Sequence, residues 1–360
     1  MIELALAFND KDGSYTEHAA VVLTTVFRNT GSPVNVHILH DETLTELNRN
    51  RLAQLVTGFN HTINFYPVAL PVEMSEALLG VSSIDKWTAG SMYRLLLPSV
   101  IQSNKVIYLD CDVMVNMDLR ELWDTELNGC YLGAIHDQGI MGVADIVRAH
   151  GLNPDTYFNS GVIVFELNNI RQYMNWYPEM VNFLRNFPST PMPDQDVLNH
   201  VYGGNFLLLD ERFNSFYTGA DQDLNQKIIH FAGEVKCWDP LSPGFALYRE
   251  NLHFTPWGTP QTKALNNRNR KRRVGRQGRH LLMKRRTRRL SPIHSGIASR
   301  SRRVKWKKST KRLRSLPKTG THRTHRDPRK ISAVPVQKRT SSVQLRFKNR
   351  RNSAPYIVNK

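Results

Sequence analysis

Strand-like and helix-like segments alternate along the first part of the chain, and this alternation restricts the folds it can adopt. Apolar runs at 2–8, 34–39 and 62–68 have the length of buried strands. Between them, segments 15–29 and 42–56 have the length and apolar spacing of helices that pack on such strands. The pattern predicts an α/β fold, with a mostly parallel sheet flanked by helices on both faces.

The pattern continues beyond the third strand. A helix is expected at 88–101, where Pro98 ends or kinks it. Further apolar runs at 130–137, 159–167 and 226–233 predict later strands. In sheets of this type, ligands bind outside the carboxyl ends of the strands, so polar residues at those ends are candidates for function.

Charge is divided unevenly between the body of the chain and its last hundred residues. Residues 1–260 hold 15 Lys and Arg against 30 Asp and Glu, whereas 261–360 hold 34 basic residues and only Asp327 as an acid. The body is therefore acidic, and the net charge of +18 comes from the tail. We expect a folded domain at 1–258 and a basic, low-complexity, disordered tail at 259–360, because few apolar residues recur there.

The cysteine content and the hydropathy of the sequence indicate the cellular compartment of the protein. Cys111, Cys130 and Cys237 are an odd number and widely spaced, which disfavours a disulfide framework and a cysteine-only zinc site. The start of the sequence lacks a basic region, and its apolar run is too short for a signal peptide. No run of about 18 apolar residues could span a membrane. These features predict a cytoplasmic protein.

Two aspartates follow a buried strand in KVIYLDCDVMV, residues 105–115. A buried carboxylate costs several kcal/mol unless it is paired or bound to a cation. Asp110 and Asp112, two positions apart at a strand end, can converge on one cation, and oxygen ligands suit Mg²⁺ or Mn²⁺. The alternative is a surface strand end with two solvated acids, which is the commoner situation for an isolated Asp-x-Asp.

Six motifs together make the sequence resemble glycosyltransferase family 8, which includes bacterial lipopolysaccharide glucosyl- and galactosyltransferases and glycogenin. In chain order they are YRLLLP (93–98), VIYLDCDVMV (106–115), LWDTEL (122–127), YFNSGVIVFEL (157–167), PDQDVLN (193–199) and IIHFAGEVKCW (228–238). The resemblance covers roughly residues 2–258. It implies the nucleotide-diphospho-sugar transferase fold called GT-A. It also implies transfer of a hexose, with retention of configuration, from UDP-glucose or UDP-galactose to a cell-envelope glycan or glycolipid.

The resemblance also implies a metal site and a diphosphate site. The metal ligands would be Asp110, Asp112 and His230, with Mn²⁺ favoured over Mg²⁺ because an imidazole joins the carboxylates. Cys111 lies in the same donor-binding stretch. Gly233 lets the backbone approach the diphosphate, and Lys236 offsets the negative charge that grows on the leaving UDP. This ligand set disfavours an inactive sugar-nucleotide-binding protein.

The remaining donor contacts are implied by family position. Ala7 and Asn9 would contact base and ribose, and Tyr15 would stack on the base. The loop between them is longer than the commonest bacterial pattern, and a plain turn is the alternative. Arg94 would reach the phosphate and the sugar of the donor. Asn159 and Ser160 would face the sugar, and Gly161 would leave room for it.

PDQDVLN carries the residues expected at the reacting face of the sugar. Helix capping explains one aspartate of this triplet, but not all three polar residues. By resemblance Asp194 contacts sugar hydroxyls, Gln195 lies near the anomeric carbon, and Asp196 is the nearest candidate for a nucleophile. The transition state would resemble an oxocarbenium ion. The sequence leaves a covalent intermediate and direct front-face attack both open.

The basic tail suggests a different function. Its 34 basic residues would bind phosphate polymers in a salt-sensitive way, so a protein that binds nucleic acid or another anionic polymer is the alternative hypothesis. Trp306 is its clearest aromatic residue and no nucleic-acid module is recognisable, so specific nucleic-acid binding is not expected. We favour docking to an anionic membrane surface, at the inner face of the plasma membrane. Folding back on the acidic body is a further alternative.

Overall fold

The computed structural model describes residues 1–219 and 221–258. The basic tail lies outside the described residues. The predictions of disorder, membrane docking and nucleic-acid binding concern the tail, so they stay predictions. In the part of the chain that the structure describes, no helix is long and apolar enough to cross a membrane.

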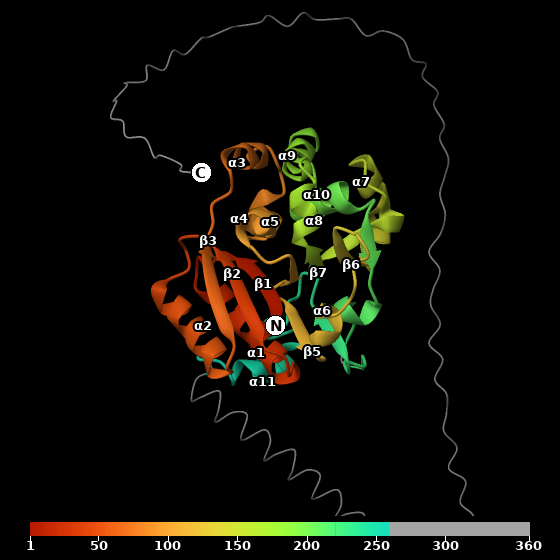
Figure 1. Ribbon diagram of the computed structural model, residues 1–360. Helices are drawn as coiled ribbons and strands as arrows, with labels where there is room; N and C mark the ends of the chain where they lie inside the picture. Colours follow the sequence, from red (N-terminus) through yellow and green to blue (C-terminus); the bar gives the residue numbers. More distant parts are fainter. Residues whose placement is uncertain (220, 259–360) are drawn as a thin grey trace, which may run out of the picture. The chain divides into compact units, whose positions relative to one another are not determined.

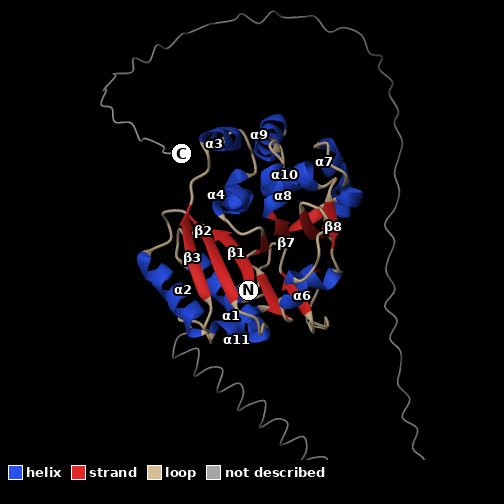
Figure 2. Ribbon diagram, in the orientation of Figure 1, coloured by secondary structure: helices blue, strands red, loops and turns tan. Residues whose placement is uncertain are grey.

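The main sheet has seven strands in the order β3-β2-β1-β4-β7-β6-β8 (Figures 1 and 2). They are β1 (Ile2–Phe8), β2 (Val34–His40), β3 (Thr62–Pro67), β4 (Lys105–Leu109), β6 (Leu132–His136), β7 (Phe158–Glu166) and β8 (Phe206–Leu208). The first four are parallel, as are β6 and β8, whereas β7 is antiparallel to both of its neighbours. The predicted α/β fold with a mostly parallel sheet is confirmed.

A second, three-stranded sheet lies beyond the end of β4. It consists of β5 (Val113–Asn116), β10 (Lys227–His230) and β9 (Ser215–Phe216), in the order β5-β10-β9. β10 runs antiparallel to β5, with His230 opposite Val113. Because Val113 directly follows Asp112, this register brings a histidine from late in the chain to the aspartates after β4.

Helices cover both faces of the main sheet (Figure 2). They are α1 (Ser14–Asn29), α2 (Glu46–Gly58), α3 (Val72–Leu78), α4 (Ile84–Met92), α5 (Leu97–Val100), α6 (Arg120–Trp123), α7 (Ala144–Ala149), α8 (Leu167–Gln172), α9 (Trp176–Asn186), α10 (Pro193–Tyr202) and α11 (Phe245–Leu252). Short 3₁₀ helices are η1 (Tyr93–Leu96), η2 (Ile140–Val143), η3 (Pro154–Thr156) and η4 (Glu211–Asn214). In Figure 1, α3, α9 and α10 lie at the top, and α1 and α11 at the bottom.

Two apolar cores lie on opposite faces of the sheet, and β1 supplies both because successive side chains of a strand point to opposite sides. Leu4 and Leu6 pack in the core that contains Leu23 of α1. Ala5 packs in the other, which contains Val197 of α10. The candidate site lies at the carboxyl end of β4, a central strand of the sheet that these two cores hold in place.

Three expected elements have different bounds in the structure. The helix expected at 88–101 is broken into α4, η1 and α5, with Pro98 inside the last piece. The apolar run 106–115 is two strands, β4 and β5, interrupted by the aspartates. The strand expected at 226–233 is limited to β10.

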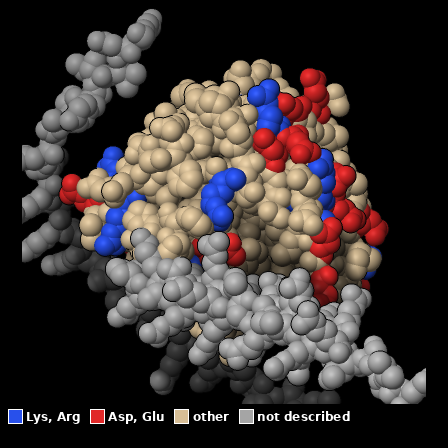
Figure 3. Space-filling model, turned by 90° about the horizontal axis from the view of Figure 1, so that it is seen from below, with Lys and Arg blue, Asp and Glu red and all other residues tan. Residues whose placement is uncertain are grey.

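Charged side chains of both signs occupy the face seen in Figure 3, where acidic groups gather along one edge. This distribution agrees with an acidic domain.

Candidate active site

Three predicted metal ligands meet where β4, β5 and β10 come together. One oxygen each from Asp110 and Asp112 and one ring nitrogen of His230 lie within 4.8 Å of one another. The backbone N–H of Asp110 donates to the carbonyl of Gly161 at 2.8 Å, which fixes the loop between the two aspartates against β7. The convergence arises from strand pairing, because His230 is 118 positions beyond Asp112 in the sequence.

The His230 ring is held on several sides. Its Nδ1 lies 2.9 Å from Oδ1 of Asn214, and its Nε2 lies 3.3 Å from Oδ1 of Asp112. The Phe216 ring meets it edge to face at 5.4 Å. A Cβ atom on Gly161 would lie only 2.2 Å from the imidazole, so the glycine makes room for this ring. The clearance expected from Gly161 for a sugar thus serves the histidine in this structure.

The chemistry of these residues fits a divalent cation. Oδ2 of Asp112 accepts a hydrogen bond from Lys236 at 2.6 Å, whereas its buried Oδ1 has no hydrogen-bond partner among the described residues. Burial raises the pKa of Asp112, but His230 and Lys236 outweigh it and hold the pKa well below the usual range. A buried, ionised oxygen without a partner is costly. A cation held by two carboxylates and one imidazole would satisfy it.

Lys236 lies beside the proposed cation site, and Gly233 precedes it by three positions in the same loop. The ammonium group of Lys236 also donates to the carbonyl of Phe231 at 3.0 Å, so two contacts hold it near Asp112. Gly233 is exposed, and a Cβ atom there would meet nothing within 4 Å. The glycine is therefore open to a ligand rather than required by packing.

Arg94 is a buried bridge between two predicted site carboxylates. Its Nη2 lies 2.8 Å from Oδ1 of Asp110, and its Nε lies 3.3 Å from Oδ2 of Asp194. Nη1 donates to the carbonyl and the hydroxyl of Ser160 at 3.0 and 3.1 Å. Burial and the nearby Asp110 raise the pKa of Asp194, although Arg94 opposes them. Arg94 thus fixes the distance between the metal ligands and the start of α10.

Gln195 is at the centre of a buried hydrogen-bond network. Its Oε1 accepts from the backbone N–H of Ser160 at 2.9 Å and from Nδ2 of Asn159 at 3.2 Å. Its Nε2 donates to Oδ2 of Asp137 at 3.1 Å, and the same oxygen accepts from Asn159 at 2.9 Å. The structure therefore brings three predicted site residues, Asn159, Ser160 and Gln195, together with Asp137.

Asp196 makes a different set of contacts from Gln195. Its two carboxylate oxygens accept hydrogen bonds from the hydroxyls of Tyr157 and Thr190, and Oδ2 also accepts from the backbone N–H of Met192 at 3.3 Å. Only 1% of the residue is exposed. These contacts support a structural role for Asp196, which anchors the start of α10, and they disfavour the nucleophile that the motif suggested.

Replacing Asp196 with alanine is expected to lower the free energy of unfolding by about 2–4 kcal/mol, because two buried hydroxyls lose a charged acceptor. Urea denaturation measures this change. Asp155, an exposed aspartate of η3, provides the control, and its alanine variant should change stability by about 0.5 kcal/mol or less. A stable Asp196 variant that has lost turnover would instead restore the nucleophile hypothesis.

The residues expected to contact the nucleoside lie at the end of β1 and the start of α1. Ala7 and Asn9 are buried. Tyr15 is 39% exposed, and burial, followed by the nearby Cys111 and Asp112, raises its pKa to about 12. Tyr15 is therefore near the proposed cation site. The Cys111 side chain packs in an apolar core, so only its backbone is available to a donor.

An aromatic stack ties the segment that carries Lys236 to α1. The rings of His18 and Trp238 are parallel within 6°, with centroids 3.8 Å apart. Nδ1 of His18 lies 2.7 Å from the hydroxyl of Tyr248, which donates to Glu17 at 2.9 Å. Burial lowers the pKa of His18 to about 4.

This shift makes stability depend on pH. The unfolded chain protonates His18 near its ordinary pKa of about 6.5, whereas the folded chain does so only near 4. Stability is therefore full above about pH 6.5 and falls as the pH drops toward 4, by about 3 kcal/mol from this group. His18→Phe should remove that part of the pH dependence in urea denaturation at pH 7 and pH 4. An unchanged difference between the two pH values would refute the assignment.

Two residues of the site are missing from the predicted set. Asp137 directly follows the strand β6, so the reasoning that selected Asp110 at a strand end could have found it. Asn214, in ERFN, is completely buried and contacts His230, but no local pattern distinguishes it from other asparagines.

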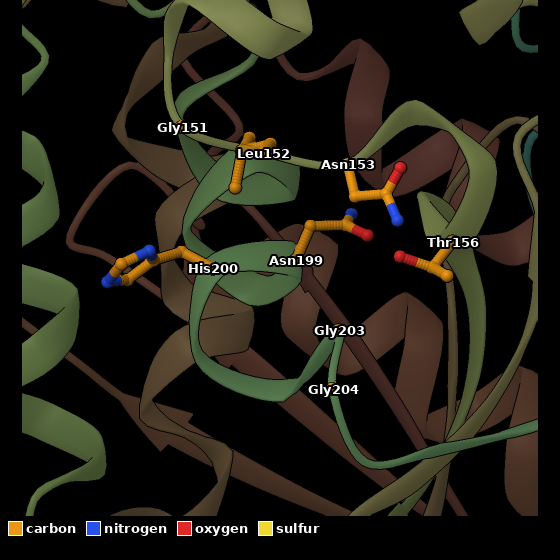
Figure 4. Close-up of a pocket in the computed structure, with 8 residues that line it drawn as sticks. All are labelled: Gly151, Leu152, Asn153, Thr156, Asn199, His200, Gly203 and Gly204. Carbon is orange, nitrogen blue, oxygen red and sulfur yellow. The ribbon is translucent and has the colours of Figure 1, made fainter.

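A separate pocket of about 230 Å³ lies at the far end of α10 (Figure 4). It is lined by Gly151, Leu152, Asn153, Thr156, Asn199, His200, Gly203 and Gly204. The Asn199 side chain exchanges hydrogen bonds with the backbone of Phe158 at 2.8 Å, which secures the start of β7. The pocket contains none of the predicted donor-site residues.

Known proteins are similar to this chain in sequence and in fold. The chain is 28% identical over 241 residues to a putative glycosyltransferase of Haemophilus influenzae, covering 63% of this chain and 71% of the relative. It is 25% identical over 281 residues to a lipopolysaccharide 1,2-glucosyltransferase of Escherichia coli, covering 71% and 80%. The solved galactosyltransferase LgtC, in complex with donor and acceptor sugar analogs, has the same fold, with a TM-score of 0.62 and 23% identity over 73% of this chain and 99% of that one.

The family assignment follows from a match to a family model. The model of glycosyl transferase family 8 matches residues 6–241, which include both aspartates, His230 and the helix α10. The chain therefore belongs to glycosyl transferase family 8, and it is a glycosyltransferase with the GT-A fold.

Proposed function

We propose that this protein is a retaining, Mn²⁺-dependent hexosyltransferase that moves glucose or galactose from UDP to a hydroxyl of a cell-envelope glycan or glycolipid. The observation that carries the proposal is the convergence of Asp110, Asp112 and His230 within 4.8 Å, beside the Gln195 network. The names of two similar proteins, a lipopolysaccharide glucosyltransferase and a galactosyltransferase, support a hexose and an envelope acceptor.

The leaving group would be held between the cation site and Lys236. A divalent cation bound by the three ligands would supply a Lewis acid for the diphosphate oxygens, with Mg²⁺ as the alternative to Mn²⁺. The Lys236 ammonium, fixed near Asp112 at 2.6 Å, lies where it can stabilise negative charge on UDP as the sugar departs. Gly233 leaves room for the diphosphate to approach the backbone.

Sugar contacts would come from the start of α10 and from β7. Arg94 holds Asp194 in place by an ion pair, which suits a carboxylate that accepts hydrogen bonds from sugar hydroxyls. Gln195, locked by Ser160 and Asp137, would present one fixed amide face to the reacting carbon. Because both Asp196 oxygens are occupied, we favour attack of the acceptor on the same face that UDP leaves, without a covalent bond to Asp196.

A panel of UDP-sugars tests the proposal. Purified full-length protein with Mn²⁺ and no acceptor is incubated with UDP-glucose, UDP-galactose, UDP-N-acetylglucosamine and UDP-xylose, and released UDP is measured. Slow hydrolysis of one or both hexose donors, abolished by a chelator, is the expected result. Hydrolysis of only the other sugars would reject the hexose, and equal rates with chelator would reject the metal dependence.

A further inference from the structure

We infer that Asn214 is a positioning residue that keeps a proton on Nδ1 of His230 and so leaves Nε2 as the nitrogen that would bind a cation. The backbone N–H of Gly161 would set this tautomer through a chain of two side-chain amides, Asn159 and Asn214. The inference rests on the proposed function, since it assigns a role to the imidazole as a cation ligand.

The backbone N–H of Gly161 sets the direction of these hydrogen bonds, because a backbone N–H can only donate. The N–H of Gly161 donates to a side-chain atom of Asn159 at 3.0 Å, and only an amide oxygen can accept there. The other end of the Asn159 amide must therefore be its NH₂ group. That group donates to Asp137 at 2.9 Å, a carboxylate that can only accept when ionised. Both ends of Asn159 are fixed independently.

The orientation of the Asn214 amide, and with it the proton on the imidazole, follows in the same way. Oδ1 of Asn159 needs a donor on its free side, and Nδ2 of Asn214 lies there at 2.9 Å. The oxygen of Asn214 then faces Nδ1 of His230, also at 2.9 Å, and a hydrogen bond forms only if Nδ1 carries the proton. A neutral imidazole protonated on Nδ1 has its lone pair on Nε2. Nε2 is the nitrogen that faces Asp112.

Because these three side chains are buried, water does not compete for their hydrogen bonds. Asn214 is 0% exposed, His230 is 4% exposed, and Asn159 is 6% exposed. A reversed amide at Asn214 would oppose its oxygen to the Asn159 oxygen, and an unpaired buried polar group costs about 1–3 kcal/mol. The wrong tautomer of His230 therefore carries an energetic penalty before any cation is bound. Partners of this type orient metal ligands in proteins generally.

The chain also joins the two halves of the site. Asn159 donates to Oε1 of Gln195 at 3.2 Å as well as to Asp137. Asn214, the amide that orients the imidazole, is thus two hydrogen bonds away from Gln195, through Asn159. A change at Asn214 should disturb His230 first and Gln195 second.

The tautomer is measurable without any substitution or metal. In ¹⁵N-labelled full-length protein, long-range ¹H–¹⁵N correlations distinguish protonated from unprotonated ring nitrogens, and His230→Gln identifies the signals of His230. We expect a proton on Nδ1 of His230 in metal-free wild type. An Nδ1 without a proton would overturn the inference, whether or not the protein binds Mn²⁺.

Two variants separate the acceptor role of Asn214 from its bulk. Asn214→Leu removes the acceptor for His230 and should weaken Mn²⁺ binding by about 10–100-fold in calorimetry. Asn214→Asp keeps an acceptor for Nδ1 and should retain Mn²⁺ affinity better than the leucine variant. Asn251→Leu, at a buried asparagine of α11 that bonds Arg28, is the control and should leave Mn²⁺ affinity unchanged.

The outcomes distinguish this inference from the proposed function. If wild type does not bind Mn²⁺, the metal dependence proposed above fails, and the spectrum of the free protein still decides the tautomer. If wild type binds Mn²⁺ and His230→Gln does not, equal affinity of Asn214→Leu and wild type would overturn the role of Asn214. If Asn214→Leu does not fold, the tautomer measured in wild type decides the inference.

Discussion

Replacing Asp112 with asparagine should lower metal-dependent UDP release by about a thousandfold, while the protein keeps its fold. The variant keeps the size of the side chain and an oxygen that accepts from Lys236. It loses the ionised oxygen that lies 3.3 Å from His230 and has no other partner among the described residues. Metal catalysis is worth several kcal/mol, and about 4 kcal/mol corresponds to a factor of about a thousand.

The control for this prediction is Asp118→Asn. Asp118 accepts from the backbone N–H of Arg120 at 2.9 Å and lies outside the site, so its variant should turn over at the wild-type rate. Both variants are compared by circular dichroism and by the rate of UDP release. Activity of Asp112→Asn close to wild type, in buffer with Mn²⁺, would remove Asp112 from the metal site.

Arg94→Met should lower the free energy of unfolding by about 3–5 kcal/mol, because the buried Asp194 and the partly buried Asp110 lose the guanidinium that pairs with both. The guanidinium is 6% exposed and contacts Asp110 at 2.8 Å and Asp194 at 3.3 Å. Arg94→Lys should recover only part of this loss, since a lysine has no fork that reaches both carboxylates at once. Urea denaturation of the three proteins measures the differences.

An exposed ion pair gives the matched comparison for Arg94. Arg120 lies 2.6 Å from Asp124, four positions along the chain, and about half of each side chain is exposed. Arg120→Met should cost about 0.5 kcal/mol or less, because solvent screens this pair. Similar losses for Arg94→Met and Arg120→Met would show that burial adds nothing to the Arg94 bridge.

The sequence predicted those parts of the fold that depend on local pattern. Apolar runs of period two and amphipathic helices are visible in any short window, and the strands β1, β2 and β3 follow them closely. The sequence also singled out Asp110 and Asp112, which the structure places near His230, because charged residues after an apolar run stand out. Asp137 escaped notice, although it too follows a strand.

Contacts between segments that are far apart in the sequence could not be predicted from local pattern. Asn214 meets His230 only because η4 precedes β9, and β9 pairs with β10 in the small sheet. The close approach of the helix α4 to β1 is another such contact. A Cβ atom on Gly90 would lie 2.8 Å from the backbone nitrogen of Asn9, so α4 packs unusually close to the end of β1. Nothing near Gly90 in the sequence encodes the position of Asn9.

Calorimetry of UDP binding to the wild-type protein, with Mn²⁺ and then with a chelator, tests most directly whether one cation joins the aspartates and His230 to the nucleotide. The account predicts that Mn²⁺ tightens UDP binding by about tenfold or more, which is about 1.4 kcal/mol, and that His230→Gln loses this gain. Equal affinity for UDP in Mn²⁺ and in chelator would contradict it.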